Sequence, residues 1–379
     1  MSDMKSLCVA HIELGAHLYG GAQQVLYLLG ELSKTEVRSV LICPERSAVG
    51  EAAREAGIEV ELIPYRGDLD WRAPKRIGEI LTRLQVDLVH VHSRRGADIW
   101  GGLAARKRGL PCVVSRRVDN RERACAVAAK YRLYDHVIAI SEGIRDVLIA
   151  DGLAPEKVSC VRSAVDWQRF QQSADKAGLV SRFDLPEDAT VIGIAAQLIP
   201  RKGHDVLLEA LSDLVPRWPN LYLLVMGKGP SESMIREQTR TLDLSRHVQL
   251  VGFVEDLEHV LPSLDFLVHP ARTEGLGVVL LQAASAGIAV IGCDAGGMPE
   301  AVIDQETGLL VPPGDVDALT TAIERLLLEP ERAEAFGAKG RDRMLASFSI
   351  SEMAQGNLNV YRAVMAARYA RAVINREGK

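Results

Sequence analysis

Residues 273–282 read Thr-Glu-Gly-Leu-Gly-Val-Val-Leu-Leu-Gln and lead directly into the apolar stretch 283–292, Ala-Ala-Ser-Ala-Gly-Ile-Ala-Val-Ile-Gly. Glu274 lies on a turn flanked by glycine, and we expect a helix to start there and to run to about Ala286. A buried strand follows the helix, and then a second glycine turn, Asp-Ala-Gly-Gly-Met-Pro-Glu, at 294–300. The stretch therefore predicts a turn, a helix and a buried strand that follow one another directly.

The start of this helix has the features of an anion site. A helix N-terminus presents free backbone N–H groups and the positive end of the helix dipole, which together favour a phosphate. Gly275 and Gly277, on either side of Leu276, let the backbone approach a ligand closely. Gln282 lies eight positions after Glu274, about 80° past two full turns at roughly 100° per residue, so both side chains can frame one ligand. With Glu274 to bind hydroxyls, the stretch predicts a nucleotide-sugar site.

Short apolar strands alternate with amphipathic helices along the whole chain. This alternation predicts parallel sheets covered by helices on both faces. The rhythm restarts after residue 185, so we expect two doubly wound domains that face each other across a cleft, with ligands at the carboxyl ends of the strands. The expected strands are 6–13, 38–43, 59–63, 87–91, 111–115, 136–140, 158–162, 190–196, 221–226, 248–251, 265–269, 289–292 and 309–311.

The domain boundaries follow from the same pattern. The chain has 379 residues, too many for one ordinary core. A polar stretch at 165–185 separates the two sets of strands, so we assign residues 1–170 to an amino-terminal domain and 171–350 to a second one. Residues 351–379 are helical in pattern and are expected to pack back on the first domain.

Composition limits the classes of protein to which the chain can belong. The net charge of −5 gives no reason to expect a nucleic-acid partner, and no run of eighteen apolar residues predicts a transmembrane helix. The chain starts with a strand-like segment and lacks the long apolar core of a signal peptide. Its six cysteines are scattered and include no Cys-x-x-Cys pair, which is typical of free thiols in a reducing cytosol. We expect a cytoplasmic protein.

Basic residues gather in one part of the first domain. Residues 94–132 contain eleven Lys and Arg against three acids. Most charge runs are solvated helix surfaces. Because the rest of the chain is acidic, we favour a basic face toward anionic lipid or a phosphorylated acceptor. Its candidate residues are Arg94, Arg95, Arg116, Arg117 and Arg121.

Two further features of the first domain carry candidate ligand contacts. The first strand ends in a glycine-rich turn with Gly20 and Gly21, which either cradles a phosphate or sugar or serves only as a tight turn. His90 and His92 share one face at the end of a strand. His92 is therefore a candidate substrate contact, although a lone histidine is usually structural. The spacing of these histidines does not predict a metal site.

In the second domain, Arg201 and Lys202 precede a helix that begins near Asp205. Cations at a helix N-terminus are unfavourable unless an anion lies between them, so the pair predicts a diphosphate site. Asp205 is alternatively the N-cap of that helix. Glycine turns after two other strands place Gly227, Phe253 and Val254 at the same edge. They contact a nucleotide through the backbone and a ring, or are plain turns.

Taken together, these motifs resemble the retaining GT-B glycosyltransferases of family 4 over nearly the whole chain. The joint set is specific although each member alone is not. The motifs are Gly20-Gly21, His136-Val-Ile-Ala-Ile-Ser-Glu-Gly-Ile-Arg, Pro200-Arg-Lys-Gly, Gly227-x-Gly-Pro, Gly252-Phe-Val, Glu274-Gly-Leu-Gly, Gly296-Gly-Met-Pro-Glu300 and Thr307-Gly-Leu-Leu-Val-Pro-Pro-Gly-Asp315.

The resemblance implies a role for several of these residues. Glu274 would hold the hydroxyls of the donor sugar. The residue at position 282 would bind the ribose; the family usually has a glutamate there, and this chain has Gln282. The family's usual arginine at position 197 is Gln197, so Lys202 with Arg201 would carry the diphosphate. The family's Asn-Gly-Val-Asp hinge reads Ser163-Ala-Val-Asp166. His92 would bind the transferred sugar or assist the acceptor.

The resemblance also implies a reaction. A sugar would pass from a nucleoside diphosphate, UDP or GDP, to an acceptor hydroxyl with retention of configuration and with neither a metal nor a cofactor. The family binds its acceptor in the amino-terminal domain, where the basic residues lie. We therefore expect an anionic glycan or lipid-linked acceptor, such as a lipopolysaccharide core, and a peripheral place on the inner face of the cytoplasmic membrane. The alternatives are another GT-B enzyme, such as an epimerase or phosphorylase, and a binding or scaffold protein with a decayed site.

Overall fold

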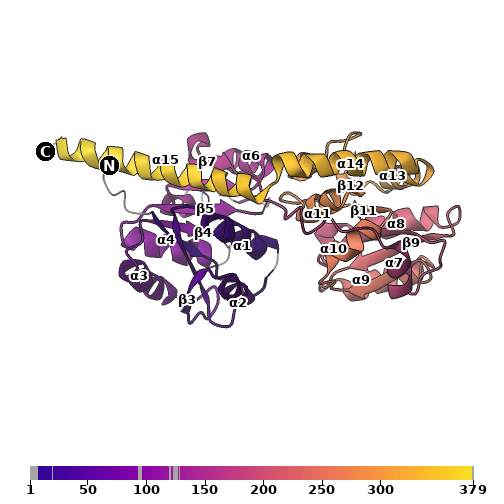
Figure 1. The fold of residues 1–379 in the computed structure, drawn as a ribbon, viewed down its shortest axis with the longest axis horizontal. Coiled ribbons are helices and arrows are strands. Elements are labelled where there is room, and N and C mark those ends of the chain that lie inside the picture. Colours follow the sequence, from indigo (N-terminus) through magenta and orange to yellow (C-terminus); the bar gives the residue numbers. More distant parts are fainter. Residues whose placement is uncertain are drawn as a thin grey trace. The chain divides into compact units, whose positions relative to one another are not determined.

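The protein is described from a computed structural model that covers residues 7–18, 20–92, 96–118, 121–122, 127 and 129–377. The chain divides into two compact units (Figure 1). The first comprises Met1–Ala164 with Ile350–Lys379, and the second comprises Val165–Ser349. The C-terminal helix thus belongs to the first unit, and the division at Val165 lies a few residues before the boundary we assigned.

The first unit is built on a seven-stranded sheet in which every strand pair is parallel. The middle of β2 is fully buried, as expected for a parallel strand covered on both faces. The strand order is β3-β2-β1-β4-β5-β6-β7. The strands are β1 (Cys8–Ile12), β2 (Arg38–Pro44), β3 (Glu59–Ile63), β4 (Leu88–Val91), β5 (Cys112–Arg116), β6 (His136–Ala139) and β7 (Val158–Cys160).

Helices cover this sheet, with α3 packed on α4 and α1 packed on both α2 and α15. The Ser47 side chain caps α2 by accepting the backbone N–H of Gly50, and the Ser141 side chain caps α6 by accepting that of Ile144. The helices are α1 (Gly20–Leu32), α2 (Ala48–Glu55), α3 (Ala73–Arg83), α4 (Ala97–Lys107), α6 (Glu142–Ala150) and α15 (Ile350–Glu377), with short 3-10 turns at η1 (Tyr131–Leu133) and η2 (Pro155–Lys157).

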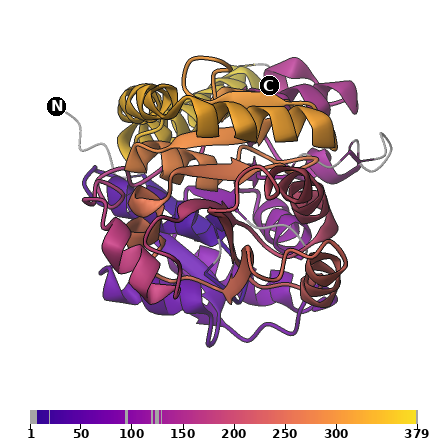
Figure 2. The same cartoon turned by 90° about the vertical axis from the view of Figure 1, so that its right-hand side faces the viewer.

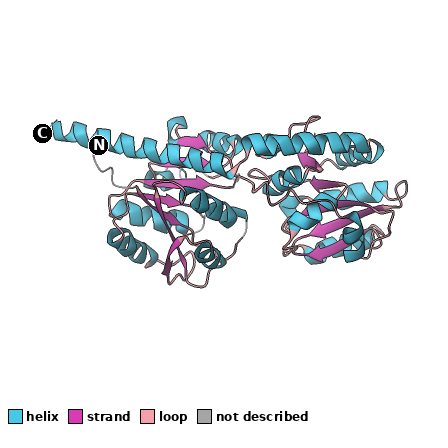
Figure 3. Cartoon of the chain, viewed as in Figure 1, coloured by secondary structure: helices cyan, strands magenta, loops and turns pink. Residues whose placement is uncertain are grey.

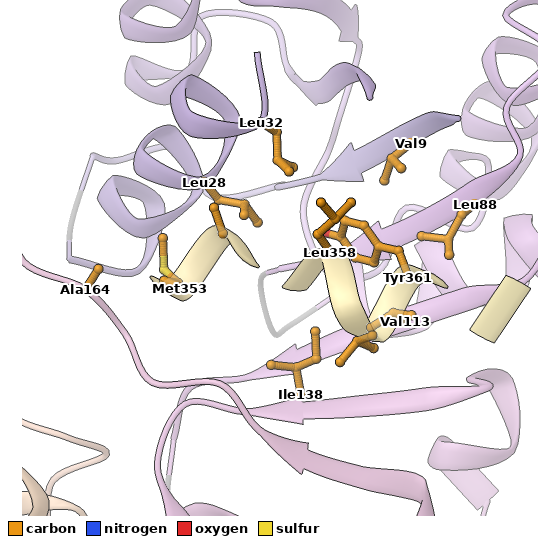
Figure 4. Packing of buried hydrophobic residues seen from close by; sticks show 12 residues of the cluster. Val9, Leu28, Leu32, Leu88, Val113, Ile138, Ala164, Met353, Leu358 and Tyr361 are labelled. Atoms are coloured by element: carbon orange, nitrogen blue, oxygen red, sulfur yellow. The ribbon is translucent and has the colours of Figure 1, made fainter. Parts of the chain in front are cut away.

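The first half of α15 completes the core of the first unit. Met353, Leu358 and Tyr361 pack against apolar residues of α1, β1, β4, β5 and β6, among them Leu28 and Val9 (Figure 4). Tyr361 is fully buried. Side chains that lie more than 190 residues apart in the sequence therefore share one core, and the unit is incomplete without its C-terminal helix.

The second unit holds a six-stranded sheet, again parallel throughout. Its strand order is β10-β9-β8-β11-β12-β13. Figure 3 shows the strands of each unit in magenta with helices in cyan around them. The strands are β8 (Thr190–Ala195), β9 (Leu221–Met226), β10 (Val248–Gly252), β11 (Phe266–His269), β12 (Ala289–Cys293) and β13 (Leu309–Val311).

In the second unit α14 packs on α11 and β12, and α13 packs on α8. Helices α13 and α14 are gold in Figure 2. The helices are α7 (Lys176–Arg182), α8 (His204–Leu214), α9 (Glu232–Thr241), α10 (Leu257–Val260), α11 (Val278–Ala286), α12 (Met298–Ala301), α13 (Val316–Leu328) and α14 (Pro330–Ser347), with 3-10 turns at η3 (Pro200–Lys202) and η4 (Leu261–Ser263).

The expected fold class of two doubly wound α/β domains is confirmed. The cleft between them stays a prediction. The five cysteines within the described residues are free. None of the described helices combines the length and the apolar character needed to cross a lipid bilayer.

Candidate functional site

The loops that follow the strands of the second sheet are joined to one another by backbone hydrogen bonds. The N–H of Leu198 donates to the carbonyl of Lys228 at 3.1 Å, and the N–H of Gly227 donates to the carbonyl of Gly252 at 2.7 Å. Since the strands are parallel, all these loops lie at the carboxyl edge of the sheet. Phe253, one residue beyond Gly252, is 56% exposed at this edge.

The loops at 200–205 and 270–274 are tied together by charge and by backbone contacts. Arg272 forms an ion pair with Asp205 at 2.6 Å, and its N–H donates to the carbonyl of Arg201 at 2.8 Å. The Arg201 guanidinium donates to the carbonyl of Thr273 at 3.2 Å. The alternative that Asp205 is an N-cap is wrong, because Gly203 occupies the N-cap position of α8.

Gly203 has a conformation that the close approach of these two loops requires. Its φ of +72° lies in the left-handed region, and a Cβ on this residue would overlap the carbonyl oxygen of Pro270. The packing of one loop on the other therefore depends on glycine at this position.

A buried charge cluster lies between the two loops. Lys202 forms an ion pair with Glu274, and the Glu274 carboxylate lies 3.3 Å from Nε2 of His269, the last residue of β11. Lys202 is 8% exposed and His269 is 1% exposed. Burial alone raises the pKa of Glu274, but the hydrogen bond with His269 and the charge of Lys202 outweigh it and lower the pKa. Burial lowers the pKa of His269. The cluster thus holds a charged carboxylate beside a fixed cation.

The expected start of the helix at Glu274 is wrong, because α11 begins at Val278. Gly277 precedes it with a φ of +84°, in the left-handed region that a helix cannot contain. Glu274 instead lies on a loop. Its backbone carbonyl accepts the N–H of Gly297 at 3.0 Å.

The remaining predicted residues of this stretch differ in what they offer a ligand. Leu276 is 1% exposed, so only its backbone is available to a ligand. Gly275 is buried as well, and Val254 and Gln282 are partly exposed. All the donor-binding candidates from Arg201 to Gln282 belong to the second unit, whereas Gly20, Gly21 and His92 belong to the first.

The first unit contains a pocket of about 340 Å³ at the carboxyl edge of its own sheet. His92 follows β4, Arg116 ends β5, and Gly21 lies in the first turn of α1. Gly20 and Gly21 are exposed at that helix N-terminus. The lining residues are Glu13, His17, Gly21, Ala22, His92, Asp98, Val114, Ser115, Arg116, Arg117, Val118, Lys130 and Tyr131.

The basic face expected at the surface of this unit is only partly correct. Arg116 is 7% exposed and Arg117 is partly buried, and both line the pocket instead of forming an open surface. Arg116 ends β5 and Arg117 follows it directly, so both lie at the edge of the sheet where the pocket is found. Arg121 is exposed. Arg94 and Arg95 lie outside the described residues.

Most charges in the pocket are paired. Lys130 forms ion pairs with Asp98 at 2.7 Å and with Glu122 at 3.1 Å, and Arg116 lies 3.4 Å from the Glu122 carboxylate. Arg117 differs, since it forms no ion pair or hydrogen bond within the described residues. Burial lowers the pKa of Arg117 to about 10 although the charge of Glu13, which also lines the pocket, acts to raise it, so the side chain is still charged at neutral pH. The pocket therefore presents a cation that is available to an anionic ligand.

Three buried histidines meet next to the pocket. Nδ1 of His11 lies 2.9 Å from Nε2 of His92, while His90 lies 2.6 Å from the Tyr361 hydroxyl and 2.9 Å from Oγ of Ser115. Burial lowers the pKa of His11 to about 3 and those of His90 and His92 well below 6.5, so the three rings are neutral. Nδ1 of His92 has no partner within the described residues and is the atom left for a ligand.

The sequence alone did not reveal the partners of the histidines. His11 lies beside His90 because β1 and β4 are neighbours in register, and one nitrogen from each of the three rings lies within 4.8 Å of the others. Strand register thus brings a third histidine to a pair whose spacing in the sequence did not predict a metal site. His269 was missed in the same way. The available signal was its position at the end of a buried strand, five residues before Glu274.

Comparisons with known proteins agree with this architecture. The family model of the glycosyl transferases group 1 matches residues 179–343, and the model of Glycosyltransferase Family 4 matches residues 19–169. The GDP-mannose-dependent alpha-(1-6)-phosphatidylinositol monomannoside mannosyltransferase of Mycolicibacterium smegmatis is 37% identical over 187 residues, 47% of this chain and 49% of that protein. The D-inositol 3-phosphate glycosyltransferase of Saccharomonospora viridis is 29% identical over 308 residues, 74% of this chain and 71% of that protein.

Solved structures with low sequence identity share the fold. Anabaena Alr3699/HepE in complex with UDP and glucose matches with a TM-score of 0.83 and 17% identity, over 93% of this chain and 99% of that one. The sucrose-phosphate synthase of Thermosynechococcus elongatus matches with a TM-score of 0.77 and 20% identity, over 95% and 100%.

The length of the sequence match qualifies what the relatives imply. The chain spans about half the length of the mannosyltransferase that it matches. The two family models, in contrast, follow each other along the chain, and they cover β2–β7 of the first sheet and all six strands of the second. The chain therefore belongs to the family 4 glycosyltransferases and has their GT-B fold.

Proposed function

We propose that the protein transfers a sugar from a nucleoside-diphosphate sugar to a hydroxyl of a phosphate-bearing acceptor, with retention of configuration. The observation that carries this proposal is the cluster of Lys202, Glu274 and His269 at the carboxyl edge of the second sheet. A fixed cation suits a diphosphate, and an adjacent carboxylate suits sugar hydroxyls.

The ion pair suggests how the donor is bound. Without donor, the charge of Lys202 is compensated by Glu274. An incoming diphosphate would share Lys202, and one Glu274 oxygen would become free to accept sugar hydroxyls. His269 would keep the carboxylate oriented and ionised.

In the reaction, the bond between the anomeric carbon and the diphosphate oxygen breaks. A bond to the acceptor oxygen forms on the same face of the sugar, and the acceptor proton passes to the departing phosphate. Lys202 and Arg201 would stabilise the charge that develops on the leaving group. Because these groups are fixed in the protein, we propose that no metal is required.

For the donor, we propose GDP-mannose as the first candidate and a UDP-sugar as the second. The support is the printed name of the mannosyltransferase relative. Phe253 would stack on the base, since its ring is exposed beside Gly227 at the edge that holds Lys202. Gln282 would contact the ribose through one donor and one acceptor.

For the acceptor, we propose a phosphorylated polyol or its lipid conjugate, bound in the pocket of the first unit. Arg117 would bind the phosphate, and Nδ1 of His92 would lie near the reacting groups. The mannosyltransferase and the inositol-phosphate glycosyltransferase are both named after a phosphorylated inositol, which favours this class over the expected lipopolysaccharide core. A lipid conjugate would make the enzyme a peripheral protein of the inner face of the cytoplasmic membrane.

Calorimetric titration of GDP-mannose, UDP-glucose and ADP-glucose into the wild type and Lys202→Ala tests the donor site. We expect one nucleotide sugar to bind the wild type and to bind the variant at least about tenfold more weakly. Lys176→Ala, which removes a surface ion pair with Asp265 in the same unit, is the matched control and should bind normally. If none of the sugar nucleotides binds or is hydrolysed, the alternative of a decayed scaffold is favoured. Conversion of the bound donor into an epimer without transfer would favour an epimerase.

A further inference from the structure

Two large apolar side chains of the first unit are strongly exposed within three residues of each other. Leu69 is 89% exposed and Trp71 is 72% exposed. They lie on the connection between β3 and α3. We call residues 64–76, which comprise this connection and the first turn of α3, the Leu69–Trp71 loop.

Hydrogen bonds hold this loop in one conformation. The carboxylate of Asp70, 6% exposed, accepts the backbone N–H groups of Arg66 at 3.0 Å and Arg72 at 3.2 Å, and it pairs with Arg76 at 2.8 Å. The indole N–H of Trp100 in α4 donates to the carbonyl of Asp68 at 3.0 Å. The fold therefore holds Asp70 inward. Leu69 and Trp71 on either side of it stay in solvent, so a partner would have to order their side chains but not the backbone of the loop.

Cationic residues lie close in the sequence to the two apolar ones. Arg66, Arg72 and Lys75 are exposed, and the Arg72 guanidinium lies 5.0 Å from the centre of the Trp71 ring. Because Arg76 already neutralises Asp70, the exposed acid left within the loop is Asp68. Outside the loop, Glu79 lies 3.9 Å from Lys75 on α3. The loop thus combines an apolar tip with an excess of positive charge.

We propose that the Leu69–Trp71 loop docks the protein on the surface of an anionic lipid bilayer. An exposed tryptophan with a neighbouring leucine suits the boundary between headgroups and acyl chains, and lysine and arginine beside them suit anionic headgroups. The apolar contact alone is small, so binding needs both contributions and is reversible and salt-sensitive. This inference rests on the proposed function, because an acceptor that is a lipid conjugate lies in the bilayer that the loop would contact.

This surface differs from the basic face that the sequence suggested. Arg116 and Arg117 line the pocket and cannot lie flat on a membrane. Arg116 and Arg117 are therefore placed to bind a ligand in the pocket. The membrane contact would be made by another loop of the same unit.

Co-sedimentation of the full-length protein with vesicles tests the proposal. The vesicles are phosphatidylcholine alone or phosphatidylcholine mixed with phosphatidylglycerol. We expect the wild type to bind the mixed vesicles. Replacing both apolar residues, Leu69→Ser with Trp71→Ser, should lower the partition coefficient about tenfold or more. Met234→Ser is the matched control, because Met234 is 68% exposed in the second unit and should not affect binding.

The charge contribution is tested separately by the pair Arg72→Glu and Lys75→Glu. This variant should lose binding to the mixed vesicles and gain nothing on phosphatidylcholine alone. Trp71→Phe should keep most of the binding but lose the blue shift of tryptophan emission on the vesicles. Such a pattern would support insertion of this residue.

Three results would overturn the proposal: no vesicle binding by the wild type, equal binding by the Leu69/Trp71 double variant, or a double variant that is monomeric where the wild type is dimeric. The last result would assign the loop to contact with a second copy. Donor titration in the same variants keeps the two proposals apart, since a failure of the donor site leaves the vesicle result unaffected.

Discussion

At the scale of single residues, Glu274 keeps its charge in a largely buried place because Lys202 and His269 lie next to it. The free energy of this arrangement depends on all three groups. Removing one partner leaves the others desolvated without compensation, which in buried pairs costs about 3–5 kcal/mol. A substitution here therefore affects both ligand binding and folding, and the two effects have to be measured separately.

We expect Glu274→Gln to lower sugar transfer about 10²–10³-fold, since the amide no longer accepts sugar hydroxyls with a full charge. Binding of the free nucleoside diphosphate should be retained or strengthened, because Lys202 loses its competing partner. Steady-state kinetics and calorimetry with and without the sugar moiety measure the two effects. The exposed Glu255→Gln is the control. Loss of nucleoside diphosphate binding in Glu274→Gln would contradict the assignment.

Arg117 allows a test in which stability and function change in opposite directions. We expect Arg117→Met to leave the thermal midpoint unchanged or higher, since it removes a partly buried cation that has no ion pair within the described residues. Use of a phosphorylated acceptor should fall at least about tenfold, seen as a higher KM. Arg54→Met, at an exposed position of α2, is the control. A normal KM together with lowered stability would show that Arg117 is only structural.

The sequence identified part of these sites. Glu274 and Lys202 were singled out because each lies in a local glycine-rich motif, and the structure pairs them, while their role toward a donor stays a prediction. His269, His11 and Tyr361 could not be predicted as neighbours of the site, because their contacts depend on strand register and on the position of α15, which are properties of the folded chain.

At the scale of helices and strands, the apolar runs located the strands of both sheets, since a strand buried on both faces is mostly apolar. The start of α11 was placed too early. A helical pattern does not predict the first residue of a helix when a glycine with positive φ lies within the pattern. Gly277 is such a residue, and α11 begins directly after it.

The C-terminal helix is expected to stabilise the first unit directly. Leu358→Ala should lower the free energy of unfolding by about 2–5 kcal/mol, because it leaves a cavity among Val9, Leu28 and their neighbours. Urea unfolding followed by circular dichroism measures the change. Arg362→Ala, on the exposed side of the same helix, should change stability by less than about 0.5 kcal/mol. Equal effects of both variants would mean that α15 is not part of the core.

The histidines of β1 and β4 predict a pH dependence of stability. Burial lowers their pKa values below the unfolded value of 6.5, to about 3 for His11, so the unfolded chain binds more protons in this window. Stability should therefore fall as the pH drops below 6.5, by up to about 1.4 kcal/mol per pH unit for each histidine.

Unfolding midpoints in urea, measured at several pH values between 7.5 and 5, check this dependence. His11→Gln should flatten the slope by one histidine, while His17→Gln, at an exposed position, should leave it unchanged. An identical slope in both variants would contradict the prediction.

At the scale of the whole molecule, the candidate donor cluster and the candidate acceptor pocket lie in different units. We expect calorimetric unfolding to show two transitions, of which only that of the second unit moves up with added nucleoside diphosphate. Lys202→Ala, which should abolish this movement, identifies the transition. A shift of both transitions in parallel would mean that the units unfold as one.

The connectivity of the first unit has a consequence for biosynthesis. Residues up to Ala164 leave the ribosome first, yet the core that they form is closed by Met353, Leu358 and Tyr361 near the other end of the chain. The second unit is contiguous, so it is complete earlier and is expected to fold first, although it is synthesised second. Limited proteolysis of the released chain truncated after Ser349 would show protection of the second unit alone. Until translation is finished, the first unit exposes apolar surface to chaperones, and a truncation after Ser349 would leave it in that state permanently.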